Sequence, residues 1–383
     1  MRAARGIVVA GGGTGGHVVP SLQIARALVA RGREPGTIEL YGSRRGQEAS
    51  VWPPLEFPFT LLPGRGIKRS FRPGALWDNL GAASGLVWAT VRAVASFVRR
   101  KPSAVVVVGG YASFAAAVAS VVTRVPLVLV HIDAVPGAVS GLFSRFAVAN
   151  TVAFDGMDLP HSHVTGTPIR PELTSLDRTE SGRRQARHAL GLPPDRKTVT
   201  VFGGSLGAGR INDAVSGLAR LWADREGLSL FHVTGRRDFE RFARFARPTP
   251  TEGATVGSGA GLHYEVVAYE ERMAEFFRAA DVCVCRAGAN TVAELSVAGL
   301  PSVLVPLPGA PRDHQTRNAQ AMVAAGAAIL IPDAQCDAER LDTELTALLD
   351  DADRLQSMSA GARGLGHPDA AALIAELVDA HVS

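Results

Sequence analysis

Cysteine is scarce in this chain, which has three cysteines among 383 residues and therefore cannot build a disulfide scaffold. Two of them, Cys283 and Cys285, share one side of an apolar run that is typical of a buried strand, because side chains two residues apart point the same way. We therefore expect the cysteines to be small core side chains in a reducing compartment, without a metal or redox role.

Long hydrophobic runs and a strong charge of one sign are also lacking. No apolar run approaches the roughly 20 residues that a membrane-spanning helix needs, and the N-terminus does not have the layout of a signal peptide. The net charge is only +4, from 40 basic and 36 acidic residues, so we expect no nucleic-acid partner. With 46% hydrophobic and 20% charged residues, a chain of this length is expected to form two globular domains.

Glycine, in contrast, is abundant, and it gathers in turns that follow apolar runs. The sequence GGGTGGH at 11–17 follows an expected strand at 6–10 and precedes an expected helix at 18–31. The sequence GGSLGA at 203–208 follows a second such strand at 197–202. Because glycines let backbone N–H groups approach an anion at a helix start, the two turns predict two Rossmann-like domains facing a cleft.

The first glycine turn also satisfies the pattern G-x-G-x-x-G, which is found in NAD-binding proteins. That fingerprint requires an acidic residue at the end of the second strand, whereas the expected strand at 37–41 continues into Gly42 and Ser43 and holds Glu39 in its interior. An NAD-dependent oxidoreductase is therefore a disfavoured alternative.

Residues 281–318 concentrate polar groups where two strands end. A strand is expected at 281–285, a turn at 286–291, a helix at 291–298 and a further strand at 301–307. Such an edge binds ligands in open α/β sheets, where a helix start suits phosphate, a carboxylate suits ribose, and an amide suits sugar hydroxyls. The polar residues of this stretch are Arg286, Asn290, Glu294, His314, Gln315 and Asn318.

Residues 66–101 mix cations with apolar side chains. Lys68, Arg69 and Arg72 precede an expected helix at 79–98, which ends in the basic sequence RRK at 99–101. Two interpretations stay open: an ordinary amphipathic helix with a basic C-terminus, or a patch that contacts an anionic membrane surface. Further along, His131 and Asp133 follow a strand expected at 126–130 and are site candidates. A hydrogen-bonded loop histidine is the less favoured interpretation of His131.

Seven motifs occur together and in order: GGGTGGHVVPSLQIARAL, GGYASF, HIDAVPG, VTGTPIRPEL, VFGGSLGAGRIN, RAGANTVAELSVAGLPSVLVPLP and DHQTRNAQAMVAAGAA. The set spans about residues 6–335 and resembles the MurG family of bacterial N-acetylglucosaminyltransferases. The resemblance implies the GT-B fold, an α/β fold of two Rossmann-like, doubly wound parallel-sheet domains facing a cleft. It implies an N-terminal acceptor domain at 1–166, joined by a C-terminal helix at about 365–383, and a C-terminal UDP-GlcNAc-binding domain at 167–364.

The same resemblance implies a hexosyltransferase that needs no metal or other cofactor. It would transfer GlcNAc, with inversion, from UDP-GlcNAc to the 4-hydroxyl of the MurNAc-pentapeptide of lipid I, giving lipid II for peptidoglycan synthesis. The protein would be peripheral on the cytoplasmic face of the cell membrane, with the anionic membrane surface as a partner.

The resemblance and the strand-end pattern assign roles to individual residues. His17 is the first candidate for the general base, because a neutral histidine can accept the acceptor's proton; His131 and Asp133 are weaker candidates. Gly13, His17 and Tyr111 belong to the acceptor side. Ser205 is expected at the phosphates, Glu270 at the uracil through its backbone, Glu294 at the ribose and Gln315 at the GlcNAc hydroxyls. The full set expected at the donor is Thr14, Gly15, Gly16, Ala134, Arg170, Ser205, Glu270, Arg286, Ala289, Asn290, Thr291, Val292, Ala293, Glu294 and Gln315.

The chain departs from the family at one motif in particular. Where the family has His-Glu-Gln-Asn, this chain has His131, Ile132, Asp133 and Ala134, so the family's carboxylate and its donor-contacting asparagine are both replaced. Two alternatives therefore stay open: a related GT-B enzyme with another lipid or a small-molecule acceptor, and a UDP-sugar-binding regulator without catalysis.

Overall fold

The computed structural model describes residues 6–13, 15–44, 56–63, 73–204, 207–243 and 261–382; within them, the side chains of 73–82 and of Tyr111 are not described. The chain divides into two compact units. The first comprises Met1–Arg170 and His367–Ser383, and the second comprises Pro171–Gly366.

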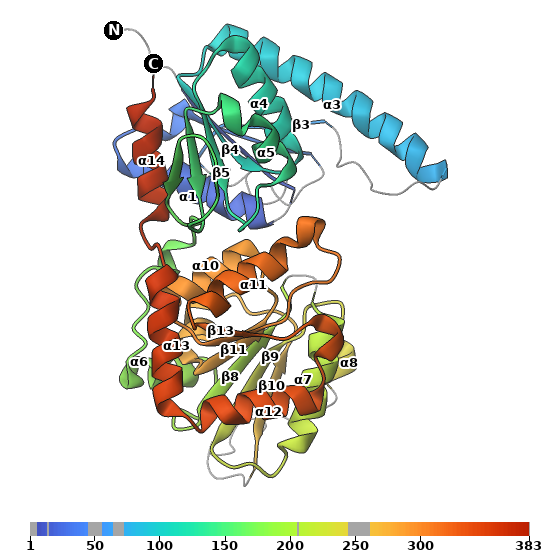
Figure 1. The fold of residues 1–383 in the computed structure, drawn as a ribbon, viewed down its shortest axis with the longest axis vertical. Helices are drawn as coiled ribbons and strands as arrows, with labels where there is room; N and C mark the ends of the chain where they lie inside the picture. Colours follow the sequence, from blue (N-terminus) through green and yellow to red (C-terminus); the bar gives the residue numbers. More distant parts are fainter. Residues whose placement is uncertain are drawn as a thin grey trace. The chain divides into compact units, whose positions relative to one another are not determined.

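The first unit is built on a parallel sheet in which strand order reverses once (Figure 1). The order is β3-β2-β1-β4-β5-β6-β7, and Ile7 of β1 pairs with Ile38 on one side and with Ala104 on the other. The central strands are apolar and buried along their whole length, as parallel strands covered on both faces must be. The strands are β1 (Ile7–Gly11), β2 (Ile38–Ser43), β3 (Phe59–Leu62), β4 (Ala104–Gly109), β5 (Leu127–His131), β6 (Ala149–Val152) and β7 (Ser162–Val164).

Helices cover the two faces of this sheet. Helix α3 packs on α4 through a stripe of alanines ending in Phe97, and α14 packs on α1. Asp379 of α14 accepts ion pairs from Arg31 at 2.6 Å and from Arg33 at 2.7 Å. The helices are α1 (Gly15–Ala30), η1 (Pro35–Thr37), α3 (Pro73–Arg100), α4 (Tyr111–Thr123), α5 (Ala138–Phe143), η2 (Ser144–Phe146) and α14 (Ala370–Ala380).

The second unit repeats this plan with a sheet of order β10-β9-β8-β11-β12-β13, again entirely parallel. Its strands are β8 (Lys197–Phe202), β9 (Leu228–Val233), β10 (His263–Val267), β11 (Val282–Cys285), β12 (Ser302–Leu304) and β13 (Ala328–Leu330). Its helices are η3 (Pro171–Leu173), α6 (Glu180–Ala189), α7 (Gly209–Leu221), α8 (Phe239–Ala243), α9 (Met273–Ala279), α10 (Ala289–Ala298), η4 (Pro311–Asp313), α11 (His314–Ala324), η5 (Asp333–Gln335), α12 (Ala338–Leu349) and α13 (Ala352–Leu365).

The two parallel, doubly wound sheets confirm the predicted fold class. The three cysteines are free and buried, as predicted. Burial is the main cause of the pKa of Cys285 lying well above its usual value. None of the helices in the described part of the chain is both long and apolar enough to span a bilayer. Three helix starts were predicted too late: α1 begins at Gly15, α10 at Ala289 and α3 at Pro73.

Candidate active site

Each sheet has one point where its strand order reverses, and in open α/β sheets ligands bind beyond the carboxyl ends of the strands there. In the first unit the reversal lies between β1 and β4, and in the second between β8 and β11. Both predicted glycine turns leave a strand that borders such a point. The predicted site residues therefore fall into two groups, one in each unit.

The turns after β1 and β4 lie against each other so closely that only glycine fits. The N–H of Gly12 donates to the carbonyl of Gly109 at 3.1 Å. A Cβ on Gly110 would lie 1.9 Å from the carbonyl oxygen of Gly12, and Gly110 has a φ of 88°. Gly13 is exposed with a φ of 95°, in the region that favours glycine, while Thr14 lies outside the described residues.

His17 stands in the first turn of α1, half-buried, and its ring packs on the backbone of Gly109. A Cβ added to Gly109 would lie 2.5 Å from Cδ2 and 2.6 Å from Nε2 of this imidazole. The absence of a side chain at 109 therefore makes the space that His17 occupies. Gly15 and Gly16, which precede His17, form the start of the same helix.

His131 ends β5 and is only 2% exposed. The amide nitrogen of Asn150 donates to the carbonyls of Ser144 at 3.0 Å and Pro160 at 2.6 Å, so Oδ1 of Asn150 remains as the acceptor for Nε2–H of His131 at 3.0 Å. Burial lowers the pKa of His131, and the hydrogen bond that His131 donates to Asn150 acts in the opposite direction. Nδ1 thus carries the lone pair, but it is buried without a hydrogen-bond partner among the described residues. Because a general base must reach its proton, this geometry favours His17 over His131.

The departure from the family motif follows His131 directly. Ile132 is 6% exposed and belongs to the core, and its carbonyl accepts a hydrogen bond from Thr167 Oγ1 at 3.1 Å. Asp133 and Ala134 are half-buried, so the side chains of Ile132 and Asp133 have different surroundings. The role of Asp133 as a candidate base stays a prediction. Arg170, which ends the first of the two segments of the first unit, is also half-buried.

In the second unit, the α10 turn (residues 286–294) leads from β11 into the first residues of α10 and holds seven of the fifteen residues that were predicted at the donor. Gly288 precedes α10 and gives no side-chain cap, so the first N–H groups of the helix point toward its open end, which is a suitable geometry for an anion. Glu294 lies one helical turn further in and is 5% exposed. Nδ2 of buried Asn318 donates to the carbonyl of Ala287 at 3.1 Å and fixes the turn to α11. Ala289, Asn290, Thr291, Val292 and Ala293 fill the intervening first turn of α10.

Arg286 is engaged within the protein. One of its terminal nitrogens donates to the carbonyls of Val305 and Pro306, each at 3.0 Å, and lies 2.6 Å from a carboxylate oxygen of Asp333. The guanidinium therefore holds the segments after β12 and β13 beside the α10 turn. Its contact with a diphosphate stays a prediction.

Two further donor candidates also have internal partners. The side-chain oxygen of Gln315 accepts a hydrogen bond from the backbone N–H of Leu307 at 2.9 Å, which leaves the side-chain NH2 as its donor group. Glu270 is 8% exposed, and Arg272 donates to both of its carboxylate oxygens at 2.9 and 3.0 Å. Burial acts to raise the pKa of Glu270, but the hydrogen bonds from Arg272 outweigh it and the pKa is lowered.

A buried polar chain that the sequence did not indicate supports the second glycine turn. Tyr264 OH donates to Nδ1 of His232 at 2.9 Å, and Nε2–H of His232 donates to Oδ1 of Asn212 at 3.0 Å. The amide nitrogen of Asn212 donates at 3.0 Å to the carbonyl of Thr234, which would lie 2.4 Å from a Cβ on Gly207. Burial lowers the pKa of His232 to about 3, so the ring is neutral. Ser205 itself lies outside the described residues.

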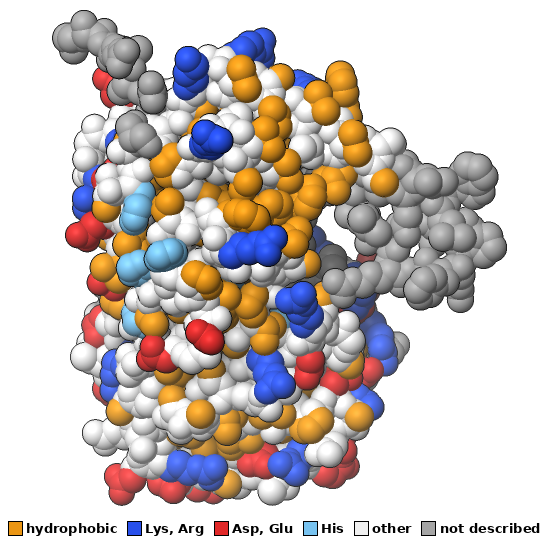
Figure 2. All heavy atoms as spheres, turned by 45° about the horizontal axis from the view of Figure 1, so that its top comes forward, with side chains coloured by type: hydrophobic (Ala, Val, Ile, Leu, Met, Phe, Trp, Pro, Cys, Tyr) orange, Lys and Arg blue, Asp and Glu red, His pale blue; other side chains and the backbone are white. Residues whose placement is uncertain are grey.

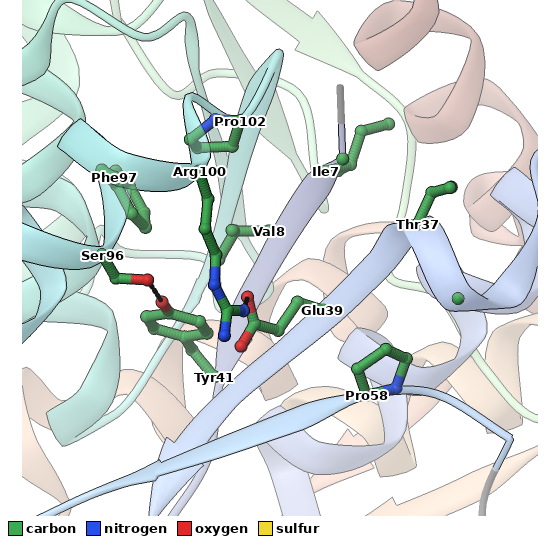
Figure 3. A pocket seen from close by; sticks show the side chains of 12 residues that line it. Ile7, Val8, Thr37, Glu39, Tyr41, Pro58, Ser96, Phe97, Arg100 and Pro102 are labelled. Carbon is green, nitrogen blue, oxygen red and sulfur yellow. Dashed lines mark hydrogen bonds and ion pairs between the residues drawn. The ribbon is translucent and has the colours of Figure 1, made fainter. Parts of the chain in front are cut away.

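A cavity of about 290 Å³ in the first unit lies at the amino ends of β1 and β2, away from the glycine turns (Figure 3). Glu39 points into it, where it pairs with Arg100 and accepts a hydrogen bond from Thr60 at 2.7 Å. Tyr41 donates to Ser96 at 3.0 Å beside this pair. Glu39 is thus occupied at the wrong end of β2 to hold a ribose, which is a second reason against the NAD alternative.

Both units match described domain families. Residues 7–152 match the glycosyltransferase family 28 N-terminal domain, and residues 198–374 match the glycosyltransferase family 28 C-terminal domain. Among curated relatives, the UDP-N-acetylglucosamine–N-acetylmuramyl-(pentapeptide) pyrophosphoryl-undecaprenol N-acetylglucosamine transferase of Alkalilimnicola ehrlichii is 39% identical over 376 residues, covering 97% of each chain. The transferases of the same name from Nocardioides sp. and Desulforudis audaxviator are 38% and 34% identical, again with 97% of each chain covered.

Two solved structures are similar to this chain in fold. MurG of Acinetobacter baumannii superposes with a TM-score of 0.78 at 26% identity, covering 99% of this chain and all of its own. The glycosyltransferase of kitacinnamycin superposes with a TM-score of 0.67 at 15% identity, which is a likeness of fold alone.

Proposed function

This chain belongs to glycosyltransferase family 28, and on that premise we propose that it transfers N-acetylglucosamine from UDP-N-acetylglucosamine to the N-acetylmuramyl-(pentapeptide) pyrophosphoryl-undecaprenol lipid. The acceptor atom is the 4-hydroxyl of the N-acetylmuramyl group, and the product is lipid II. The observation that carries this proposal is that relatives named for this transfer, at 34–39% identity, match 97% of the chain and 97% of their own length.

The reaction is a displacement at C1 of the N-acetylglucosamine. The acceptor oxygen forms a bond to C1 while the bond from C1 to the β-phosphate oxygen of UDP breaks, so the configuration inverts. The acceptor's hydroxyl proton goes to a base, for which we propose His17, and the electron pair leaves with UDP. We propose that N–H groups at the start of α10 and in the second glycine turn stabilise the charge that develops on the diphosphate.

On the donor side, we propose that Glu294 accepts hydrogen bonds from the ribose hydroxyls. A carboxylate is the natural partner of a vicinal diol, because it offers two acceptor oxygens and no donor. Gln315 would donate its NH2 to a sugar hydroxyl, since its oxygen already serves Leu307. The buried side chain of Glu270 is held by Arg272, so a contact with the uracil would come from its backbone.

The membrane partner is proposed from the outer face of α3. One stripe of this helix is buried on α4, but Val87, Trp88 and Val91 on another face are 52–65% exposed, with Arg92 and Arg99 exposed beside them. Leu142 and Phe146 are also exposed, and Arg145 lies over the Phe146 ring at 4.8 Å. Figure 2 shows hydrophobic side chains with Lys and Arg among them on the upper part of this face. Such a surface suits the interface of an anionic bilayer, which we take to be the cytoplasmic leaflet where the lipid acceptor is presented. The predicted basic residues Lys68, Arg69 and Arg72 lie outside the described residues.

Vesicle co-sedimentation tests this surface. Trp88→Ser with Val91→Ser should weaken binding to phosphatidylglycerol vesicles, whereas Leu221→Ser, which removes an exposed leucine from the second unit, should not. Equal binding by all three proteins would remove α3 from the membrane contact.

The transfer itself is tested with radiolabelled UDP-N-acetylglucosamine and a short-chain analogue of the lipid acceptor, with and without EDTA. Labelled lipid product well above background is expected in both conditions. If UDP-N-acetylglucosamine binds by calorimetry but no product forms, either the acceptor is a different one or the chain has lost the transfer activity. Ile132 and Ala134 then become the first positions to restore to the family's glutamate and asparagine.

A further inference from the structure

A basic pocket of about 610 Å³ lies in the second unit at the amino ends of β8 and β11. It is therefore on the opposite edge of the sheet from the α10 turn and the second glycine turn. Helices α6 and α13 supply much of its wall. Its lining includes five cationic side chains, which are Arg178, Arg183, Arg187, Lys197 and Arg363. It also includes three carboxylates, which are Glu180, Asp195 and Asp281.

The three carboxylates are already engaged. Asp281 accepts from Arg187 at 2.8 Å and from the backbone N–H of Thr198 at 2.7 Å. Glu180 pairs with Arg183 at 2.7 Å. Asp195 pairs with Arg184, which does not line the pocket. Each carboxylate of the pocket is therefore paired with an arginine: two with Arg183 and Arg187 of the lining, and one with Arg184 outside it.

The other three cations have only neutral partners. Within the described ranges, no carboxylate pairs with Arg178, Lys197 or Arg363. Their hydrogen bonds go to the carbonyls of Phe277 and Leu349 and, at 2.7 Å, to Ser359 Oγ. Neutral oxygens orient these side chains but do not neutralise them. Lys197 and Arg363 are exposed, whereas Arg178 is half-buried, so the cost of an uncompensated charge falls mainly on Arg178. The pKa of Arg178 is accordingly lowered to about 10, chiefly by burial, with Arg183 and Arg363 lowering it further and Asp281 raising it.

We propose that this pocket binds a soluble phosphoryl anion, held by Arg178, Lys197 and Arg363. Guanidinium groups match the oxygens of a phosphate in pairs, and a lysine adds a point charge. The anion supplies the negative charge that the wall lacks. None of the large exposed hydrophobic side chains of the described residues lines the pocket, so nothing there would enter a bilayer, which favours a dissolved anion over a lipid headgroup.

Pyrophosphate is the probe, titrated by calorimetry into the full chain that has been saturated with UDP to fill the donor site. One further binding event is expected. Arg178→Gln with Arg363→Gln should weaken it by at least about tenfold, because hydrogen bonds to charged groups are lost. Arg354→Gln removes the same charge from an exposed position of α13 that does not line the pocket, and it should bind as the parent does.

Arg363→Gln alone is the second variant. Among the described residues its side chain donates one hydrogen bond, to Ser359, and the loss of this bond should not prevent folding. The proposal is overturned if the UDP-saturated protein takes up no pyrophosphate. It is overturned equally if both arginine variants bind pyrophosphate as tightly as Arg354→Gln. If these variants lose binding to phosphatidylglycerol vesicles while pyrophosphate never binds, the pocket recognises a headgroup and a soluble ligand is wrong.

Discussion

Replacing Glu294 by alanine should sharply weaken the binding of UDP. Glu294 stands one turn inside α10 and is 5% exposed, so water cannot take over hydrogen bonds that its carboxylate makes to a ligand. A hydrogen bond to a charged group contributes about 1.5–3 kcal/mol. The loss of one such bond therefore raises the Kd of UDP by roughly 10- to 150-fold, and the loss of two raises it further.

Calorimetric titration of UDP into the parent, Glu294→Ala and Glu294→Gln measures the effect. Glutamine keeps the shape and one acceptor oxygen but loses the charge, so its Kd should fall between the other two. Glu339→Ala, a matched change at an exposed position of α12, should leave the Kd unchanged. Near-ultraviolet circular dichroism should show that each variant keeps its tertiary packing.

A UDP analogue without ribose hydroxyls makes the test specific to the ribose. The parent should bind 2′,3′-dideoxyuridine diphosphate weakly, and Glu294→Ala should cause little additional loss, because the two changes remove the same hydrogen bonds. An unchanged Kd for UDP in a folded Glu294→Ala variant, or equal losses for UDP and the dideoxy analogue, would remove Glu294 from the ribose.

Three further predictions follow from particular contacts. Gly109→Ala places a Cβ 2.5 Å from the His17 ring, so it should lower kcat as much as His17→Ala does. The affinity for UDP should stay the same in both variants, and full activity of both would show that His17 is not the base. His232, with a pKa of about 3 in the fold, stays neutral while the unfolded chain takes up a proton below about pH 6.5. Its contribution to the free energy of unfolding is therefore complete above pH 6.5, and about 1.4 kcal/mol is lost for each pH unit toward pH 3. When the urea concentration at the unfolding midpoint is plotted against pH, His232→Gln should flatten the curve between pH 3 and 6.5. Arg187→Gln leaves Asp281 without its buried partner and should destabilise the second unit by about 3 kcal/mol in denaturant unfolding, and a change below about 1 kcal/mol would contradict this.

The sheets and their glycine turns could be predicted because their signals are local. The strands expected at 6–10 and 197–202 appear as β1 and β8, since continuous apolar runs followed by glycine leave few other interpretations. Strand β7 gave no such signal: its residues, Ser162–Val164, are all exposed, and only pairing with β6 makes it a strand.

The partners of the site residues could not be predicted, because they join positions far apart in the chain. Nothing around His131 indicates that Asn150, on the next strand, fixes which ring nitrogen carries its proton. Arg286 was expected at the diphosphate from its place in the turn, but its hydrogen bonds to the carbonyls after β12 and its ion pair with Asp333 depend on the tertiary fold. Sequence patterns thus located the edge of each sheet, while the chemical state of each side chain came from contacts across elements.

The C-terminal helix α14 has a consequence for how the protein is made. The first unit needs α14, which buries Ile374 and Val378 and pairs Asp379 with Arg31 and Arg33, while the second unit is one uninterrupted stretch between its two pieces. On the ribosome, where domains generally fold as they emerge, the second unit can be complete before the first. The face of α1 that α14 covers therefore stays uncovered in the nascent chain until α14 has emerged. A message that ends shortly after residue 366 would yield an intact second unit attached to a first unit that lacks its last helix.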